Sequence, residues 1–415
     1  MTTRNIIAYV LVAVVVMTLG ALAGWYFFLR GQSQATIAAD SARGSSVTAP
    51  FGSPTGSTYQ NMISGVSDFA AKSTVAQSGP LPQLWHADVA PVAGFAFTGS
   101  ASSTRLLYVE QGSGYVFAAD ASTQNIARLT NTLLPKIYEA FITSDKTVVE
   151  RSLDSNDVIT TFSARIATST QDAYSTTTVA ALSGSYLNPN IRALAINPTT
   201  NEVFSIEGAL PTITGYRMQW DGSKRKSVFT TAVGGWRPMW LPDGRIILLT
   251  LPADGVLGYA YALESDGSLT SLVRALPGLT ILPRSSSSAM LYGMSTGAGL
   301  SLFAQVDSKA APAILPIRTV ADKCVWAPGK DLVAYCAVPQ EVLTGNFLDD
   351  WYKGIAHTAD SWWRIDASAG KAELVYAPNP SLLLDASSPV MDARGEYIAF
   401  RNLRDGSLWV LRLKK

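Results

Sequence analysis

The sequence has few of the side chains on which metal centres and nucleophilic catalysis depend. It contains only two histidines and two cysteines in 415 residues. A structural zinc site takes four ligands, and a Ser-His-Asp triad needs a histidine base. We therefore predict no metal site and no cofactor, and a structural role for both His86 and His357.

Charged residues are also scarce. They make up 15% of the chain, the formal net charge is +1, and the longest basic run is Lys224–Lys226. A protein that binds nucleic acid presents a basic face to the phosphates. The charge balance therefore argues against a nucleic-acid partner.

One catalytic pattern does occur, the G-x-S-x-G of hydrolases at Gly293–Gly297. The nucleophile elbow needs a strand before this pattern and a helix after it. Here Leu300–Val306 has the composition of another strand, and Gly297–Gly299 that of a hairpin turn. We interpret the match as coincidental.

A single long hydrophobic run lies near the amino terminus. Residues 6–29 carry no charge and lie between Arg4 and Arg30. At about 1.5 Å per residue, such a helix spans a hydrocarbon core of ~30 Å. We predict an uncleaved transmembrane anchor in residues 1–30, with the bulk of the chain extracytoplasmic. The alternative is a cleaved signal peptide, because Ala21–Ala23 has the A-x-A form.

Residues 31–80 are rich in Ser, Thr, Ala and Gly and have no sustained apolar period. Such a segment cannot bury enough surface to offset the entropy of ordering it. We predict a flexible linker between the anchor and a domain at 81–415.

The domain consists of short apolar runs broken by turn residues every 8–12 positions, which is typical of an all-β fold. Seven runs share a position before a turn and a second strand. They are Gly94–Phe97, Tyr138–Phe141, Ala193–Ile196, Arg237–Trp240, Leu279–Leu282, Lys323–Trp326 and Ser388–Met391. Their ends are 44, 55, 44, 42, 44 and 65 residues apart, and 40–45 residues is the length of a four-stranded propeller blade. We predict a seven-bladed β-propeller, with six or eight blades as the alternatives.

Two stretches carry a family resemblance. Trp240–Gly244 and Arg404–Leu411 resemble the WD40-like repeats of TolB-type β-propellers. Cys336–Pro339 and Asp349–Gly354 resemble segments of single-pass, membrane-anchored bacterial propeller proteins. The resemblance covers residues 81–415 and implies a propeller fold used for protein contacts, without catalytic residues.

Ring closure can also be predicted. The chain ends with the third strand of a blade, Ser407–Leu413, which leaves an exposed edge. The stretch Gln83–Asp88 precedes the first repeat and alternates as a strand does. We predict that it pairs with Ser407–Leu413 as the fourth strand of the seventh blade.

Cys324 and Cys336 flank a predicted turn centred on position 330, which sets them opposite each other. Neighbours in a non-hydrogen-bonded antiparallel pair lie ~4.5 Å apart between Cα atoms, within disulfide range. We predict a disulfide, and the alternative is a pair of buried free thiols.

The sixth repeat holds an insertion, Pro339–Ser361, that combines aromatic and charged residues. This is the composition of binding hot spots. The candidate binding residues are Phe347, Asp349, Asp350, Trp351, Tyr352 and Lys353. The alternative is that Trp351 and Tyr352 fold back and seal one end of the propeller.

Together these patterns predict a non-enzymatic binding or scaffold protein of the cell envelope, with a protein or glycan partner. The alternative is an envelope hydrolase or lyase that uses carboxylates in the propeller channel.

Overall fold

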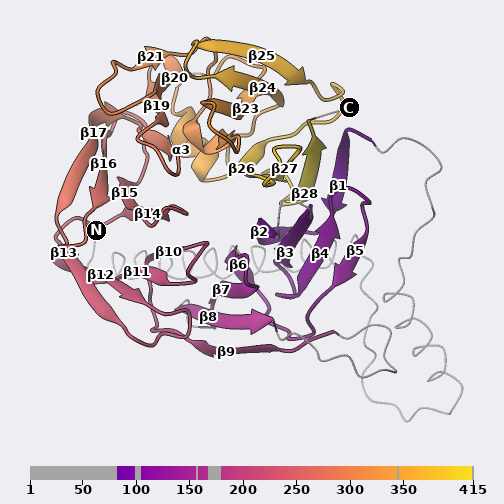
Figure 1. The fold of residues 1–415 in the computed structure, drawn as a ribbon, viewed down its shortest axis with the longest axis vertical. Coiled ribbons are helices and arrows are strands. Elements are labelled where there is room, and N and C mark those ends of the chain that lie inside the picture. The colour runs from indigo at the N-terminus through magenta and orange to yellow at the C-terminus, as the bar shows by residue number, and fades with distance from the viewer. Residues whose placement is uncertain (1–81, 99–103, 156–157, 167–178, 344, 414–415) are drawn as a thin grey trace, which may run out of the picture. The chain divides into compact units, whose positions relative to one another are not determined.

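The computed structural model describes residues 82–98, 104–155, 158–166, 179–343 and 345–413. They form seven four-stranded antiparallel sheets arranged as the blades of a ring (Figure 1). The predicted seven-bladed propeller is therefore confirmed. Residues 6–29, the predicted anchor, and 31–80, the predicted linker, lie outside the described residues. Within those residues, no helix has the length and apolar character needed to cross a membrane.

The blades follow one another along the chain. We number the blades 1 to 7 along the chain and give the strands of each from the centre outward. Blade 1 consists of β2 (Val92–Thr98), β3 (Arg105–Glu110), β4 (Val116–Asp120) and β5 (Ile126–Arg128), and blade 2 of β6 (Ile137–Ile142), β7 (Thr147–Leu153), β8 (Ile159–Ile166) and β9 (Leu182–Tyr186). Blade 3 consists of β10 (Ala193–Ile196), β11 (Val203–Ala209), β12 (Thr212–Met218) and β13 (Lys226–Thr231), and blade 4 of β14 (Trp236–Trp240), β15 (Ile246–Thr250), β16 (Leu257–Leu263) and β17 (Leu269–Pro277). Blade 5 consists of β18 (Thr280–Pro283), β19 (Met290–Thr296), β20 (Gly299–Gln305) and β21 (Ala313–Ile314), and blade 6 of β22 (Cys324–Trp326), β23 (Val333–Pro339), β24 (Asp360–Asp366) and β25 (Lys371–Tyr376). Blade 7 consists of β26 (Ala386–Met391), β27 (Tyr397–Asn402), β28 (Leu408–Arg412) and, as its outermost strand, β1 (Leu84–Asp88). Each predicted repeat ends in the innermost strand of a blade.

In the described part of the chain, two short helical segments interrupt this pattern, the 3-10 turn η1 (Ala321–Lys323) and the helix α3 (Phe347–Tyr352). Helix α3 lies in the insertion of blade 6, between β23 and β24. Figure 1 shows it inside the ring of blades.

The ring closes through the predicted strand at its start. β1 pairs antiparallel with β28, with Trp85 opposite Val410 and His86 opposite Trp409. The rings of His86 and Trp409 stack with their centroids 4.2 Å apart. Blade 7 is thus completed by a strand from the other end of the chain, and the prediction is confirmed.

The hydrophobic core is divided among the interfaces between neighbouring blades. Of the eight clusters of buried apolar residues in the described chain, seven lie at the interfaces of the closed ring, one at each. In β15, Ile246 and Leu248 pack toward blade 3, whereas Ile247 and Leu249 pack toward blade 5. Because successive side chains of a strand point to opposite faces, a strand buried on both faces has a continuous apolar run.

The disulfide is also present. Cys324 on β22 and Cys336 on β23 are register partners, and their Cα atoms lie 4.0 Å apart. The predicted register, which fixes both side chains on one face, is therefore correct.

One carboxylate departs from this apolar pattern. Glu150 on β7 is 1% exposed and shares a side of the strand with Val148, which packs against blade 1. Neither carboxylate oxygen has a hydrogen-bond partner among the described residues. Burial raises the pKa of Glu150 from 4.5 to about 8.

The closing strand can be tested by truncation. A chain that begins at residue 89 lacks β1, and it loses buried Trp85 and exposes the edge of β28. Removal of a buried tryptophan alone costs about 3–5 kcal/mol, and an open edge promotes aggregation. We expect a correspondingly lower urea midpoint than for a chain that begins at residue 82, which keeps every described strand. Equal midpoints for the two chains would contradict the closure.

The buried carboxylate predicts a pH trend. Because its pKa is raised in the folded protein, Glu150 keeps a proton that the unfolded chain releases near pH 4.5. Its contribution to stability is present below that pH and falls between about pH 4.5 and about 8, by up to ~1.4 kcal/mol per pH unit. In urea titrations, Glu150→Gln should remove this fall and exceed the parent in stability at pH 8. Glu373→Gln, at an exposed position on β25, is the control and should keep the parental trend; a parental trend in Glu150→Gln would refute the assignment.

Candidate ligand-binding face

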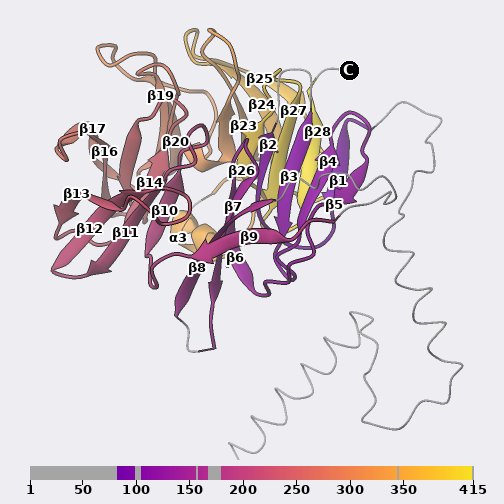
Figure 2. The same cartoon turned by 60° about the horizontal axis from the view of Figure 1, so that its bottom comes forward.

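The two faces of the ring differ in their connections. In an up-and-down blade, the connection between the second and third strands and the connection to the next blade emerge on the same face. We call this face the insertion face, because it carries residues 340–359 between β23 and β24. Figure 2, turned by 60° from Figure 1, shows strands running between the two faces.

Exposed hydrophobic side chains gather on the insertion face. Sixteen large hydrophobic residues are exposed in the described chain, and ten of them lie in connections on this face. These ten are Val89, Leu133, Leu210, Val233, Leu251, Val256, Val342, Tyr352, Ile355 and Leu383. The other six lie within strands, and the described connections of the opposite face contain none. The insertion face is therefore the candidate contact surface, since single exposed apolar residues are ordinary but grouped ones are not.

Part of this surface is continuous over blades 3 and 4. The side chains of Leu210 and Leu251 approach Gly234 and Gly235 from the connections on either side. Val233 lies in the same connection as the two glycines. The three aliphatic residues therefore border one stretch of backbone.

Helix α3 is held by residues of other blades. Asp254, in the connection between β15 and β16, accepts hydrogen bonds from the backbone amides of Leu348 and Asp349, at 2.8 and 3.3 Å. Its own amide donates to Oδ1 of Asp349 at 2.9 Å. The N-cap residue Asn346 makes no side-chain capping bond, so Asp254 satisfies the helix start in its place. Ser295, the serine of the G-x-S-x-G pattern, is buried and donates to Asp254, while its strand β19 leads into a hairpin with β20.

Of the six candidate binding residues, two aromatic rings turn inward. Phe347 and Trp351 are buried in a cluster with Leu348, Leu300 and Val320. Four residues apart on a helix, they share one face. The position of Trp351 matches the alternative in which it seals the propeller.

The other four candidates line the outer side of α3. Tyr352 is 40% exposed and its hydroxyl donates to Asp322, which also pairs with Arg237 of blade 4. Asp349 is engaged by Asp254, and Lys353 is exposed. Asp350 accepts the amides of Ile355 and Ala356 through its backbone carbonyl. Tyr352 and Lys353 are exposed, whereas Asp349 and Asp350 are half-buried, so the first two are the candidate contacts on the surface.

A fully buried ion network lies beneath the helix. Lys323 Nζ donates to Oδ2 of Asp360 at 2.7 Å, to Oδ1 of Asp385 at 2.6 Å and to Oγ1 of Thr358 at 2.9 Å. Trp351 Nε1 donates to the same oxygen of Asp385 at 2.9 Å. Burial raises the pKa of Asp360, whereas the pKa of Asp385 is lowered because Lys323 and its hydrogen bonds outweigh the effect of burial. The network ties α3 to blades 6 and 7.

His357, the second histidine, lies at the edge of this network. Its Nδ1 is 3.0 Å from Oδ2 of Asp385. Across the described residues, no group of three or more His, Cys, Asp or Glu side chains is arranged to hold a metal ion.

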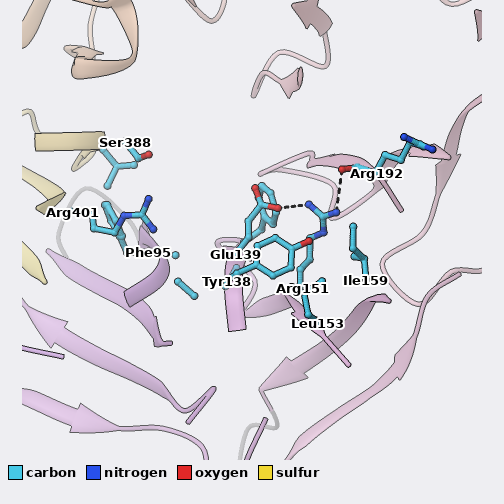
Figure 3. A pocket seen from close by; sticks show the side chains of 14 residues that line it. Phe95, Tyr138, Glu139, Arg151, Leu153, Ile159, Arg192, Ser388 and Arg401 are labelled. Atoms are coloured by element: carbon cyan, nitrogen blue, oxygen red, sulfur yellow. Dashed lines mark hydrogen bonds and ion pairs between the residues drawn. The ribbon is translucent and has the colours of Figure 1, made fainter. Parts of the chain in front are cut away.

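A pocket of about 710 Å³ lies at the inner edges of blades 7, 1 and 2 (Figure 3). It lies toward the insertion face, because its wall includes Leu153 and Ile159 on either side of the β7–β8 connection. Phe95 and Tyr138 supply aromatic walls. A single carboxylate, that of Glu139, lines it.

Three arginines also line this pocket, and they have different partners. Arg151 is paired with Glu139 and donates from Nη2 to the carbonyl of Ile191 at 2.5 Å. Arg192 donates to the carbonyl of Gly208, and Figure 3 shows its side chain directed away from Glu139 and Arg151. Arg401 lies across the pocket from them.

The amino-acid sequence alone does not predict this pocket. Its charged residues come from β6, β7, β27 and the connection between β9 and β10, and each stands alone in an ordinary sequence pattern. No spacing along the chain signals that they meet, because the closure of the ring brings them together.

No family model matches the chain, and no curated protein matches it. Among solved structures, it is similar to an oligogalacturonate lyase in complex with manganese (TM-score 0.50, 11% identity, covering 80% of this chain and 91% of that one). It is also similar to the tricorn protease (TM-score 0.50, 11% identity, covering 82% of this chain and 35% of that one). TolB from Acinetobacter baumannii gives a TM-score of 0.42 at 11% identity, covering 76% of this chain and 65% of that one. At such identities the likeness is one of fold alone.

The role of the helix residues can be separated by substitution. Trp351→Ala should lower the free energy of unfolding by about 3–5 kcal/mol, because it empties a packed site and removes a hydrogen bond to Asp385. Tyr352→Phe should cost less, about 1.5–3 kcal/mol, the value of one hydrogen bond to a charged group, because its ring is not removed. Urea denaturation measures both, and an unchanged midpoint for Trp351→Ala would contradict its packing role.

Proposed function

We propose that this chain is a non-enzymatic, membrane-anchored binding or scaffold protein of the cell envelope, whose insertion face docks a protein partner. The observation that supports it is the gathering of ten exposed hydrophobic residues in the connections of that face. An exposed apolar surface of this kind stabilises a complex when a partner covers it.

The chemistry of the exposed residues favours protein over glycan. Nine of the ten are aliphatic, and Tyr352 is the one aromatic. Sugar rings are polar at their edges and leave little aliphatic surface to cover, whereas protein interfaces bury aliphatic and aromatic side chains at their centre. Burial of Leu, Val and Ile against a protein removes apolar area from water on both sides.

The anchor in residues 6–29 and the extracytoplasmic position of the propeller belong to this proposal. The Cys324–Cys336 bond supports the position, because disulfides persist in oxidising compartments. The hydrolase or lyase alternative has less support, since the one carboxylate lining the pocket, Glu139, is already paired with Arg151.

A site-directed photo-cross-linker tests the docking face. Benzophenone side chains at Leu251 and Val342, on the insertion face, should give the same discrete adduct in the native membrane. The same group at Leu374, which is also exposed but lies on the outer strand β25, is the control and should give none.

Competing substitutions make the test specific. Val342→Asp combined with Ile355→Asp should reduce the Leu251 adduct at least ~10-fold, because charges would be buried in the contact. Both positions are exposed, so the melting temperature should not change. Adducts at all three positions, or an adduct with a second copy of the chain, would contradict a dedicated partner on this face.

A further inference from the structure

Two of the three arginines that line the pocket have no ion pair with a described carboxylate: Arg192, whose side chain is directed away, and Arg401. The side chain of Arg401 makes one hydrogen bond with the described residues, from Nη1 to the carbonyl of Val92 at 3.5 Å, the limit of such a contact. No ion pair joins it to any described carboxylate. Glu139, the carboxylate of the same pocket, is paired with Arg151.

Several other half-buried arginines have stronger partners. Arg217, Arg237 and Arg245 pair with the carboxylates of Glu202, Asp322 and Asp243, and Arg284 donates to the carbonyls of Gly329 and Asp331 at 2.6 and 3.0 Å. A charge removed from water costs free energy unless a partner compensates it. Burial accordingly lowers the pKa of Arg401, and the more distant Glu139 only partly opposes the shift.

The wall beside Arg401 has an irregular backbone. The pairing of β26 with β27 shifts between Ser387 and Val390, and Ser388 adopts a left-handed φ of +50°. Bulges of this kind redirect side chains and occur next to binding sites, where such strain is retained. Figure 3 shows Ser388 beside Arg401 at the edge of the pocket, so a hydroxyl donor accompanies the guanidinium.

We propose that this pocket binds the carboxylate of a ligand with an apolar body, and that Arg401 is its anchor. Arg151 and Glu139 cancel in charge and the side chain of Arg192 is directed away, which leaves the positive charge of Arg401 facing the cavity. A guanidinium receives a carboxylate through two parallel hydrogen bonds. Phe95, Tyr138 and Val390 supply apolar wall for the rest of the ligand, and about 710 Å³ falls within the range of small-molecule sites. This site does not depend on the protein-docking function of the insertion face.

Calorimetry with 3-phenylpropionate on the full chain tests the proposal. We expect a dissociation constant of the order of 1 mM, ordinary for so small a probe, and at least ~10-fold weaker binding of 3-phenylpropanamide, which has the same shape without the charge. Inorganic phosphate, a second probe, should bind more weakly than the carboxylate, because it cannot use the apolar walls.

Two variants locate the contact. Arg401→Gln should weaken the binding of 3-phenylpropionate at least ~10-fold. The melting temperature of the free protein should be unchanged or higher, because the substitution removes an uncompensated cation. Arg192→Gln, at the pocket edge with its side chain directed away, should bind as the parent does. The proposal fails if the amide binds as well as the acid, if phosphate binds and the acid does not, if no probe binds, or if the two variants behave alike. If no partner is cross-linked but 3-phenylpropionate still binds, only the proposed docking face is refuted.

Discussion

The closed ring depends on the pairing of β1 with β28. Each blade contributes to two interfaces, so a propeller core is complete only when the first and last blades meet. Here a strand from residues 84–88 completes blade 7, and Trp85 and Ala87 enter the cluster that joins this blade to blade 1. The pairing removes the free edge of β28, and it converts an open array of sheets, each held only by its neighbours, into a ring with seven equivalent interfaces.

The sequence predicts the propeller well because each blade repeats the same local pattern, an innermost strand followed by a turn. A hairpin such as Trp240–Gly244 needs a residue with positive φ, and Gly244 has a φ of +91°. Innermost strands precede such turns at intervals of 42–44 residues where no insertion intervenes. The position of the turn sets the strand register that places the two cysteines opposite each other. The alternating pattern of residues 83–88 indicates the strand that closes the ring.

The candidate site is less predictable because its contacts join distant positions. Asp254 caps α3 from 94 residues away, and nothing around it distinguishes it from other aspartates in turns. The composition of the insertion makes the residues of α3 candidates for binding, but composition alone does not say which ring faces the core. The spacing of Phe347 and Trp351 would have separated them from Tyr352, had a helix been expected there. For Arg401 no local signal exists, since its environment is built by blades 7, 1 and 2 together.

The insertion of blade 6 covers one side of the ring at the insertion face and leaves the other side uncovered. Helix α3 is bound by Asp254 of blade 4, packs against Gly278 before blade 5, and is tied through Trp351 to Asp385 before blade 7. It therefore occupies the inner edge of the insertion face over blades 4 to 7. The pocket lies over the remaining side, at blades 7, 1 and 2, where no such insertion intervenes. On the covered side the buried cation Lys323 has two carboxylates, whereas on the open side Arg401 has none. The cation that the fold covers is thus neutralised by the fold, whereas the cation that lines the pocket has no described carboxylate as a partner.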